Sequence, residues 1–305
     1  MSPPFRLLVL ACGFSGMCWA ARCTTVLDPL ALDAYEAYVI AAEEAASARF
    51  AAGELAWVPH SASAEASARL DSGRVIRQKL SDAAVNQRIA GQNAAIVHWI
   101  GAVHIREVDL ADLRTVLEDY PSYDRVYQPI FVGFRAERGG SGPDSGYDAT
   151  FWLQHKFAFA SLFRQHYAFR MKARIEYSHT DVSSGPALLV HMRSSEVRES
   201  DSGVPGRNDL MELYHDHGII WAVNAYWRAR RREGGVYFEF ETITLARSVQ
   251  EFACKIGFIP VPRSMAAAAM DSLPAEALQV MLEGAKAECE RRAAARAASS
   301  PLLRQ

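Results

Sequence analysis

The side chains best suited to chemistry lie on two apolar-alternating runs, 217–231 and 236–245. One alternate set on these runs is polar: Asn224, Tyr226, Arg228, Glu239 and Glu241. An arginine beside two carboxylates can bind a polar head group or place a general acid or base. The alternative is a cross-strand ion pair on the solvent side, contributing about 0.2–1 kcal/mol. We favour the ion pair, because the other alternate set is far more apolar.

That other set is rich in aromatic residues, which line pockets for small apolar ligands. From this set the candidate ligand-binding residues are Trp221, Val223, Trp227, Phe238 and Phe240. Trp99 and Trp152, on other predicted strands, are added to them as candidates. The alternative is that these rings pack against a C-terminal helix. Both interpretations hold together if a curved sheet wraps a helix and leaves space between them, and we expect a ligand cavity there.

Histidines form a third group. His215-Asp216-His217 is an alternating pair, and His98 and His104 share a face of an earlier run. A metal site requires three or four convergent ligands, and nothing in the spacing brings these groups together. We therefore predict no metal site and keep His217 as a further member of the polar candidates. Motifs for serine hydrolases, zinc proteases and nucleotide binding are missing from the sequence, so no cofactor is predicted.

Composition is that of an ordinary soluble globular protein: 305 residues, 50% hydrophobic and 22% charged. The net charge of -2 gives no general attraction to nucleic acid. Residues 1–21 resemble a secretory signal, with Arg6, an apolar stretch and small residues at Ala20 and Ala21. We expect an exported protein, periplasmic or secreted, with no transmembrane span after cleavage.

Cysteine usage adds little. Cleavage leaves Cys23, Cys254 and Cys289, an odd number without zinc spacing, and any pairing among them stays open. A lipid anchor at Cys12 is a less favoured alternative to cleavage after Ala20 or Ala21.

The strongest structural pattern is a hairpin. A two-residue turn at 233–234 or 234–235 pairs odd positions of the first strand with even positions of the second, and sets Arg228 opposite Glu239 or Glu241. Further strands are predicted at 95–105, 130–136, 147–157, 163–179 and 187–197. Helices are predicted at 28–50, after an Asp109 cap, and from 261 onward. Pro274 should kink or split the last helix.

This order resembles the START-like, or helix-grip, superfamily. Four segments carry the resemblance, and they are similar to segments of a group of exported bacterial START-like proteins. They are His98-Trp99-Ile100-Gly101-Ala102-Val103, Leu117-Glu118-Asp119-Tyr120, Asp216-His217-Gly218 and Asn224-Ala225-Tyr226-Trp227-Arg228. The resemblance implies an α+β fold in which a curved antiparallel sheet wraps a C-terminal helix and encloses a cavity. The helical and extended segments before residue 94 are expected to form an N-terminal helical appendage. The expected divisions are a signal peptide (1–21), the appendage (22–93), the START-like domain (94–290) and a flexible tail (291–305).

Three functions follow as hypotheses. The first is a non-enzymatic exported protein that binds or carries a hydrophobic small molecule or lipid. The second is an enzyme of the same fold that uses Arg228, Glu239, Glu241 or His217 inside the cavity. The third is a structural interaction protein of the cell envelope. The oligomeric state is left open.

Overall fold

The computed structural model describes residues 24–51, 64–81, 89, 92–139, 146–159, 163–182, 185–248, 255–256, 259–260 and 263–299. The predicted signal peptide, the alternative anchor at Cys12, and Cys23 and Cys254 lie outside these residues. Among the described residues Cys289 is a free, buried thiol. No helix in these ranges is long and apolar enough to cross a membrane.

One antiparallel sheet of eight strands dominates the fold, in the order β2-β3-β10-β9-β7-β6-β5-β4. Its strands are β2 (Ile76–Lys79), β3 (Ala94–Arg106), β4 (Phe131–Arg138), β5 (Tyr147–Phe159), β6 (Phe163–Val182), β7 (Gly185–Glu199), β9 (Ala222–Arg232) and β10 (Gly235–Arg247). The predicted strands and their antiparallel arrangement are confirmed, while β3 pairs with β10 and not with β4, the next strand in the chain. Part of the N-terminal appendage joins this sheet, because β2 pairs with β3.

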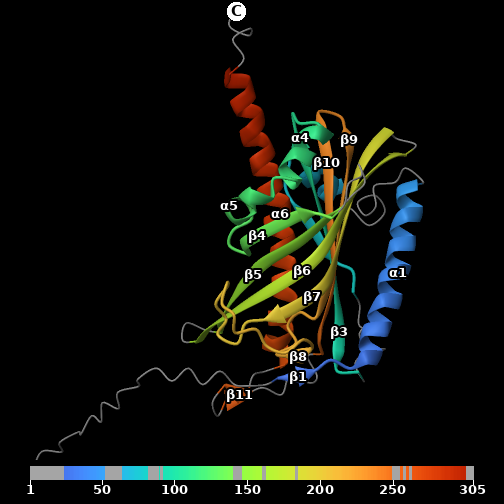
Figure 1. Ribbon diagram of the computed structural model, residues 1–305. Coiled ribbons are helices and arrows are strands. Elements are labelled where there is room, and N and C mark those ends of the chain that lie inside the picture. Colours follow the sequence, from blue (N-terminus) through green and yellow to red (C-terminus); the bar gives the residue numbers. More distant parts are fainter. Residues whose placement is uncertain are drawn as a thin grey trace, which may run out of the picture.

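Two helices cover opposite faces of the sheet (Figure 1). On one face lies α6 (Arg263–Ser299), and on the other lies α1 (Pro29–Ala51). The apolar stripe of α6 is buried in the main core: Leu278, Met281, Leu282, Ala285 and Cys289. The α+β, helix-grip fold predicted from the sequence is therefore the fold of this chain.

The course of α6 differs from expectation in two ways. Pro274 does not split the helix, which runs as one element from Arg263 to Ser299. The helix also continues through 291–299, a segment expected to be a flexible tail. Ion pairs with residues in and just after α4 (Leu110–Leu117) hold this part, because Arg292 contacts Asp119 and Arg296 contacts Asp112.

The hairpin of β9 and β10 has the first of the two predicted two-residue turns, at 233–234. Arg232 pairs with Gly235, so Glu233 and Gly234 form the turn, and Gly234 adopts a φ of +73°. Gly235 serves another purpose, because a Cβ there would lie 2.1 Å from the carbonyl oxygen of Ile105 on β3. The register sets Arg228 directly opposite Glu239, as predicted.

Smaller elements close the ends of the sheet. The predicted Asp109 cap begins α4 (Leu110–Leu117) with a reciprocal capping box to Asp112. After it come η1 (Tyr120–Ser122) and α5 (Tyr123–Val126), which lead into β4. The remaining elements are α2 (Ala64–Asp71), β1 (Thr25–Val26) paired with β8 (His215–Asp216), and β11 (Lys255–Ile256) paired with β12 (Ile259–Pro260).

Candidate ligand-binding cavity

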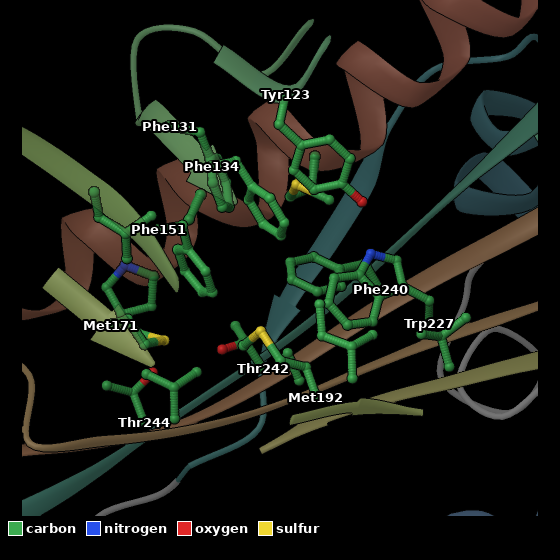
Figure 2. A pocket seen from close by; sticks show the side chains of 18 of the residues that line it. Tyr123, Phe131, Phe134, Phe151, Met171, Met192, Trp227, Phe240, Thr242 and Thr244 are labelled. Carbon is green, nitrogen blue, oxygen red and sulfur yellow. The ribbon is translucent and has the colours of Figure 1, made fainter. Parts of the chain in front are cut away.

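A cavity lies between the sheet and α6, and Figure 2 shows its lining from close by. The lining side chains are almost all apolar or aromatic and none is charged: Leu117, Tyr123, Phe131, Phe134, Phe151, Leu153, Met171, Ile175, Tyr177, Val190, Met192, Ile220, Val223, Ala225, Trp227, Phe240, Thr242, Thr244, Leu273, Pro274, Ala277 and Met281. The chain thus encloses an apolar space whose walls come from β4 to β7, β9, β10, α4, α5 and α6.

The space is small in this conformation. Its volume is about 70 Å³, whereas an apolar cavity that admits benzene measures roughly 150 Å³. Three of its wall residues are methionines, Met171, Met192 and Met281. Methionine has three rotatable bonds and adapts to irregular gaps. A larger ligand therefore requires these side chains to move.

Pairs of aromatic rings in contact form parts of the wall. Phe134 stacks on Phe151 with ring centroids 5.2 Å apart, and Tyr123 lies 4.5 Å from Phe134. On the hairpin side, the rings of Trp227 and Phe240 are 4.9 Å apart across the β9–β10 pair. These contacts hold two walls of the cavity in place.

Of the seven predicted ligand-binding residues, Val223, Trp227 and Phe240 line the cavity. Phe238 is fully buried in the main core but lies outside the lining. Trp99 packs against the same core from a partly buried position, and Trp152 is half-buried on β5; neither is part of the lining.

Trp221 is a correction to the predicted apolar face. It packs in the cluster beneath α1, with Tyr35, Val39 and Leu245, and not with Trp227. The reason is local, because Trp221 precedes the first residue of β9, and its indole N–H donates to Asp216 Oδ1 at 2.9 Å. The two-residue period therefore does not extend to it.

The sequence reasoning missed an aromatic group at the other end of the cavity. Tyr123 precedes β4, while Phe131 and Phe134 lie three positions apart on that strand, a spacing that normally puts side chains on opposite faces. The register of β4 against β5 shifts between Phe131 and Gly133. This irregularity brings both phenylalanines to the cavity.

The predicted polar cluster exists, but on the opposite face of the sheet from the cavity. Arg228 donates to Glu239 at 3.0 Å and to Glu241 at 2.5 Å, and His98 lies 2.7 Å from Glu241. The expectation that this face meets solvent is wrong, because α1 covers it. Glu239 is 0% exposed and Glu241 is 2% exposed.

Side chains of α1 complete this polar layer. Tyr38 bonds to the second ring nitrogen of His98 at 2.8 Å, Tyr35 accepts from Asn224 at 3.0 Å, and Glu43 accepts from Tyr226 at 2.7 Å. The predicted members Asn224 and Tyr226 therefore hold α1 in place. Each is satisfied within the protein.

Burial and nearby charges shift the pKa values of Glu239 and Glu241 in opposite directions. Burial raises the pKa of Glu239 to about 7, against the opposing effect of Arg228. Burial also raises the pKa of Glu241. The charge of Arg228 and the hydrogen bond from His98 outweigh this effect and lower the pKa to about 2. The cluster is thus built around an ionised Glu241 paired with Arg228.

His217 lies apart from this cluster. Its Nδ1 is 2.8 Å from Glu199 Oε1, and the two neighbouring residues Asp216 and Glu199 are 1% exposed. Burial raises the pKa of Asp216 to about 7, with the Glu199 charge adding to the effect.

Of the other histidines, His104 is buried and His215 is half-exposed beside Glu212. Within the described ranges no three such groups converge as metal ligands.

No protein-family model matches the chain, and comparison with curated proteins finds no match. Among solved structures, a STAR-related lipid transfer protein from Xanthomonas axonopodis is 12% identical, with a TM-score of 0.34, over 68% of this chain and 98% of that one. Human STARD10 is 9% identical, with a TM-score of 0.35, over 81% and 87%.

A two-domain aromatase/cyclase, StfQ of the steffimycin biosynthetic pathway, is 11% identical with a TM-score of 0.37. The match covers 70% of this chain and 56% of that protein. The structural superposition on each of these three proteins is loose. The helix-grip fold is therefore assigned from the curved sheet and the C-terminal helix of this chain itself.

Proposed function

We propose that the chain binds a hydrophobic small molecule or lipid in the cavity between the sheet and α6. The observation that carries this proposal is the lining, which is apolar or aromatic and contains no charged side chain. Pockets for small apolar ligands are lined in this way. The methionine side chains of Met171, Met192 and Met281 give such a pocket the freedom to adapt to its occupant.

The acid–base groups of the alternative enzyme hypothesis do not reach this space. Helix α1 covers the other face of the sheet (Figure 1). Arg228, Glu239 and Glu241 are on that face and pair with one another. Their close packing is that of a structural ion-pair network. We therefore propose binding or carriage as the function, and not chemistry by these groups.

A neutral fluorescent probe, N-phenylnaphthylamine, tests the proposal. We expect saturable binding to the purified chain, and loss of that binding in Ala277→Leu, which adds bulk to the cavity wall contributed by α6. Ala287→Leu is the matched control, because Ala287 is exposed on the same helix. Native mass spectrometry of the purified chain should find a co-purifying apolar molecule. Absence of probe binding to the wild type would overturn the proposal.

We also propose that the protein is exported, on the strength of the signal-like residues 1–21. Sequencing the N-terminus of the mature protein tests this. The expected result is a chain that begins after Ala20 or Ala21, and an intact N-terminus on protein recovered from the cytoplasm would contradict it.

A further inference from the structure

The cavity wall contains few polar side-chain atoms. Five lining residues carry a side-chain nitrogen or oxygen: Tyr123, Tyr177, Trp227, Thr242 and Thr244. Both tyrosine hydroxyls already have partners. Tyr123 and Tyr177 each donate to the carbonyl of Leu117, at 2.5 Å and 3.1 Å. Three groups remain for a ligand.

These three groups have no partner in the part of the chain that the structure describes. The indole Nε1 of Trp227 is buried and makes no hydrogen bond, although the residue is only 7% exposed. Thr242 and Thr244 are 5% and 2% exposed, and no hydrogen bond of either hydroxyl is found within the described ranges. Of the three, the Trp227 nitrogen is the fully buried one. A buried polar group without a partner destabilises the fold, so its presence calls for an explanation.

The register places all three on one wall. Thr242 pairs with Ala225 and Thr244 with Val223, while Trp227 pairs with Phe240, two positions along from Thr242. Side chains two apart on a strand face the same way. Trp227, Thr242 and Thr244 thus form a row of neutral hydrogen-bonding groups beside the apolar space, and Figure 2 shows them with the lining residues.

The absence of charged side chains from the wall restricts the ligand further. A carboxylate or phosphate in this space would lose its water without gaining a cation, which is strongly unfavourable. The nearest arginine along the strand, Arg228, is committed to Glu239 and Glu241 on the opposite face. The part of the ligand that enters the cavity must therefore be neutral.

We propose that the cavity selects a neutral, largely apolar molecule carrying a carbonyl or hydroxyl oxygen, which hydrogen-bonds to Trp227 and to Thr242 or Thr244. The indole N–H requires an acceptor, and the threonine hydroxyls both donate and accept. This inference rests on the proposed function, and it names the class of ligand: apolar ketones, alcohols and quinone-like molecules in preference to pure hydrocarbons and to acids.

Matched competitors for bound N-phenylnaphthylamine test the inference. Naphthalene, acetylnaphthalene and naphthoate share one ring system and differ in the oxygen group and its charge. We expect acetylnaphthalene to displace the probe at a concentration about two- to tenfold lower than naphthalene, the range for one net hydrogen bond. Naphthoate should be the weakest of the three.

Variants locate the effect. Thr242→Val with Thr244→Val should shrink the preference for acetylnaphthalene over naphthalene, taken as the ratio of the two affinities in that variant, and Trp227→Phe alone should shrink it as well. Thr150→Val on β5 is the control, because Thr150 lies outside the cavity lining, and it should leave the preference unchanged. The single Trp227→Phe variant keeps the test decisive if the double variant does not fold.

The outcomes separate the two proposals. If the wild type does not bind the probe, both the proposed function and this inference fail. If the probe binds but acetylnaphthalene and naphthalene compete equally, or naphthoate competes as well as the ketone, only the inference fails. An unchanged preference in both Trp227→Phe and the double threonine variant also overturns it.

Discussion

Trp227 and Arg228 are neighbours on β9, and their side chains lie on opposite faces of the sheet. Trp227 lines the apolar cavity, and Arg228 is buried with Glu239 and Glu241 beneath α1. The alternation of a strand thus separates a neutral ligand space from a charged layer by one residue. Substitutions on the two faces should therefore have separable effects on ligand binding and on stability.

Replacing Arg228 should destabilise the fold strongly. Arg228→Met leaves Glu239 and Glu241 buried without their cation, and removal of one partner of a buried ion pair costs about 3–5 kcal/mol. Urea unfolding of the purified protein measures the loss. Arg231→Met, at an exposed position of the same strand, should change the unfolding free energy little.

The loss in Arg228→Met comes from uncompensated charge, so removing the carboxylates as well should restore part of it. Arg228→Met combined with Glu239→Gln and Glu241→Gln is expected to be more stable than Arg228→Met alone. If the single variant is as stable as the wild type, the ion-pair layer does not support the fold.

The sequence predicted the hairpin register, because alternation and a two-residue turn allow only registers that match the apolar sets. It could not predict that α1 covers the face of the sheet that carries Arg228. An apolar stripe on 29–51, with Tyr35 and Val39, indicates that this helix packs on something, but not on which face of the sheet. The cavity residues Phe131 and Phe134 escaped prediction for a related reason, since an irregular strand pairing follows no fixed period.

Asp216 should make stability depend on pH. Burial, with the Glu199 charge, raises the pKa of Asp216 from 3.8 to about 7. Between about pH 4 and 7 the folded state holds a proton that the unfolded state has released, so this group lowers stability as pH rises through that interval. Asp216→Asn removes the effect while keeping an acceptor for Gly218 and Trp221.

Urea midpoints at pH 5 and pH 8 check this expectation. The wild type should lose more stability between the two values than Asp216→Asn does. Asp33→Asn, at an exposed position on α1, should follow the wild type. Equal pH dependence in wild type and Asp216→Asn would show that Asp216 does not carry a raised pKa.

Gly101 should be intolerant of any side chain, because α6 crosses β3 there. A Cβ at Gly101 would lie 2.6 Å from Leu278 Cδ2 and 2.8 Å from the carbonyl oxygen of Ile76. Overpacking of this kind typically costs about 1–3 kcal/mol, so Gly101→Ala should lower the unfolding free energy by that amount. Gly133→Ala is the control, since its nearest neighbour would be 3.8 Å away, and equal effects at the two sites would argue against the close approach.

The three methionines should set the range of ligand sizes. The cavity of about 70 Å³ must enlarge to admit most apolar ligands. Changing Met171, Met192 and Met281 to leucine together keeps the hydrophobic character and nearly the volume, but removes the flexible thioether chains. We expect binding of pyrene to weaken more than binding of naphthalene, measured by displacement of N-phenylnaphthylamine.

Met211→Leu serves as the control for this variant, because Met211 lies outside the cavity lining, and it should leave both affinities unchanged. The physical reason for the size dependence is that a larger ring system must displace more of the wall, which leucine with fewer rotatable bonds accommodates less well. A triple variant that loses both ligands equally would mean that the wall does not adapt through these methionines, and that the cavity opens instead by movement of its backbone elements.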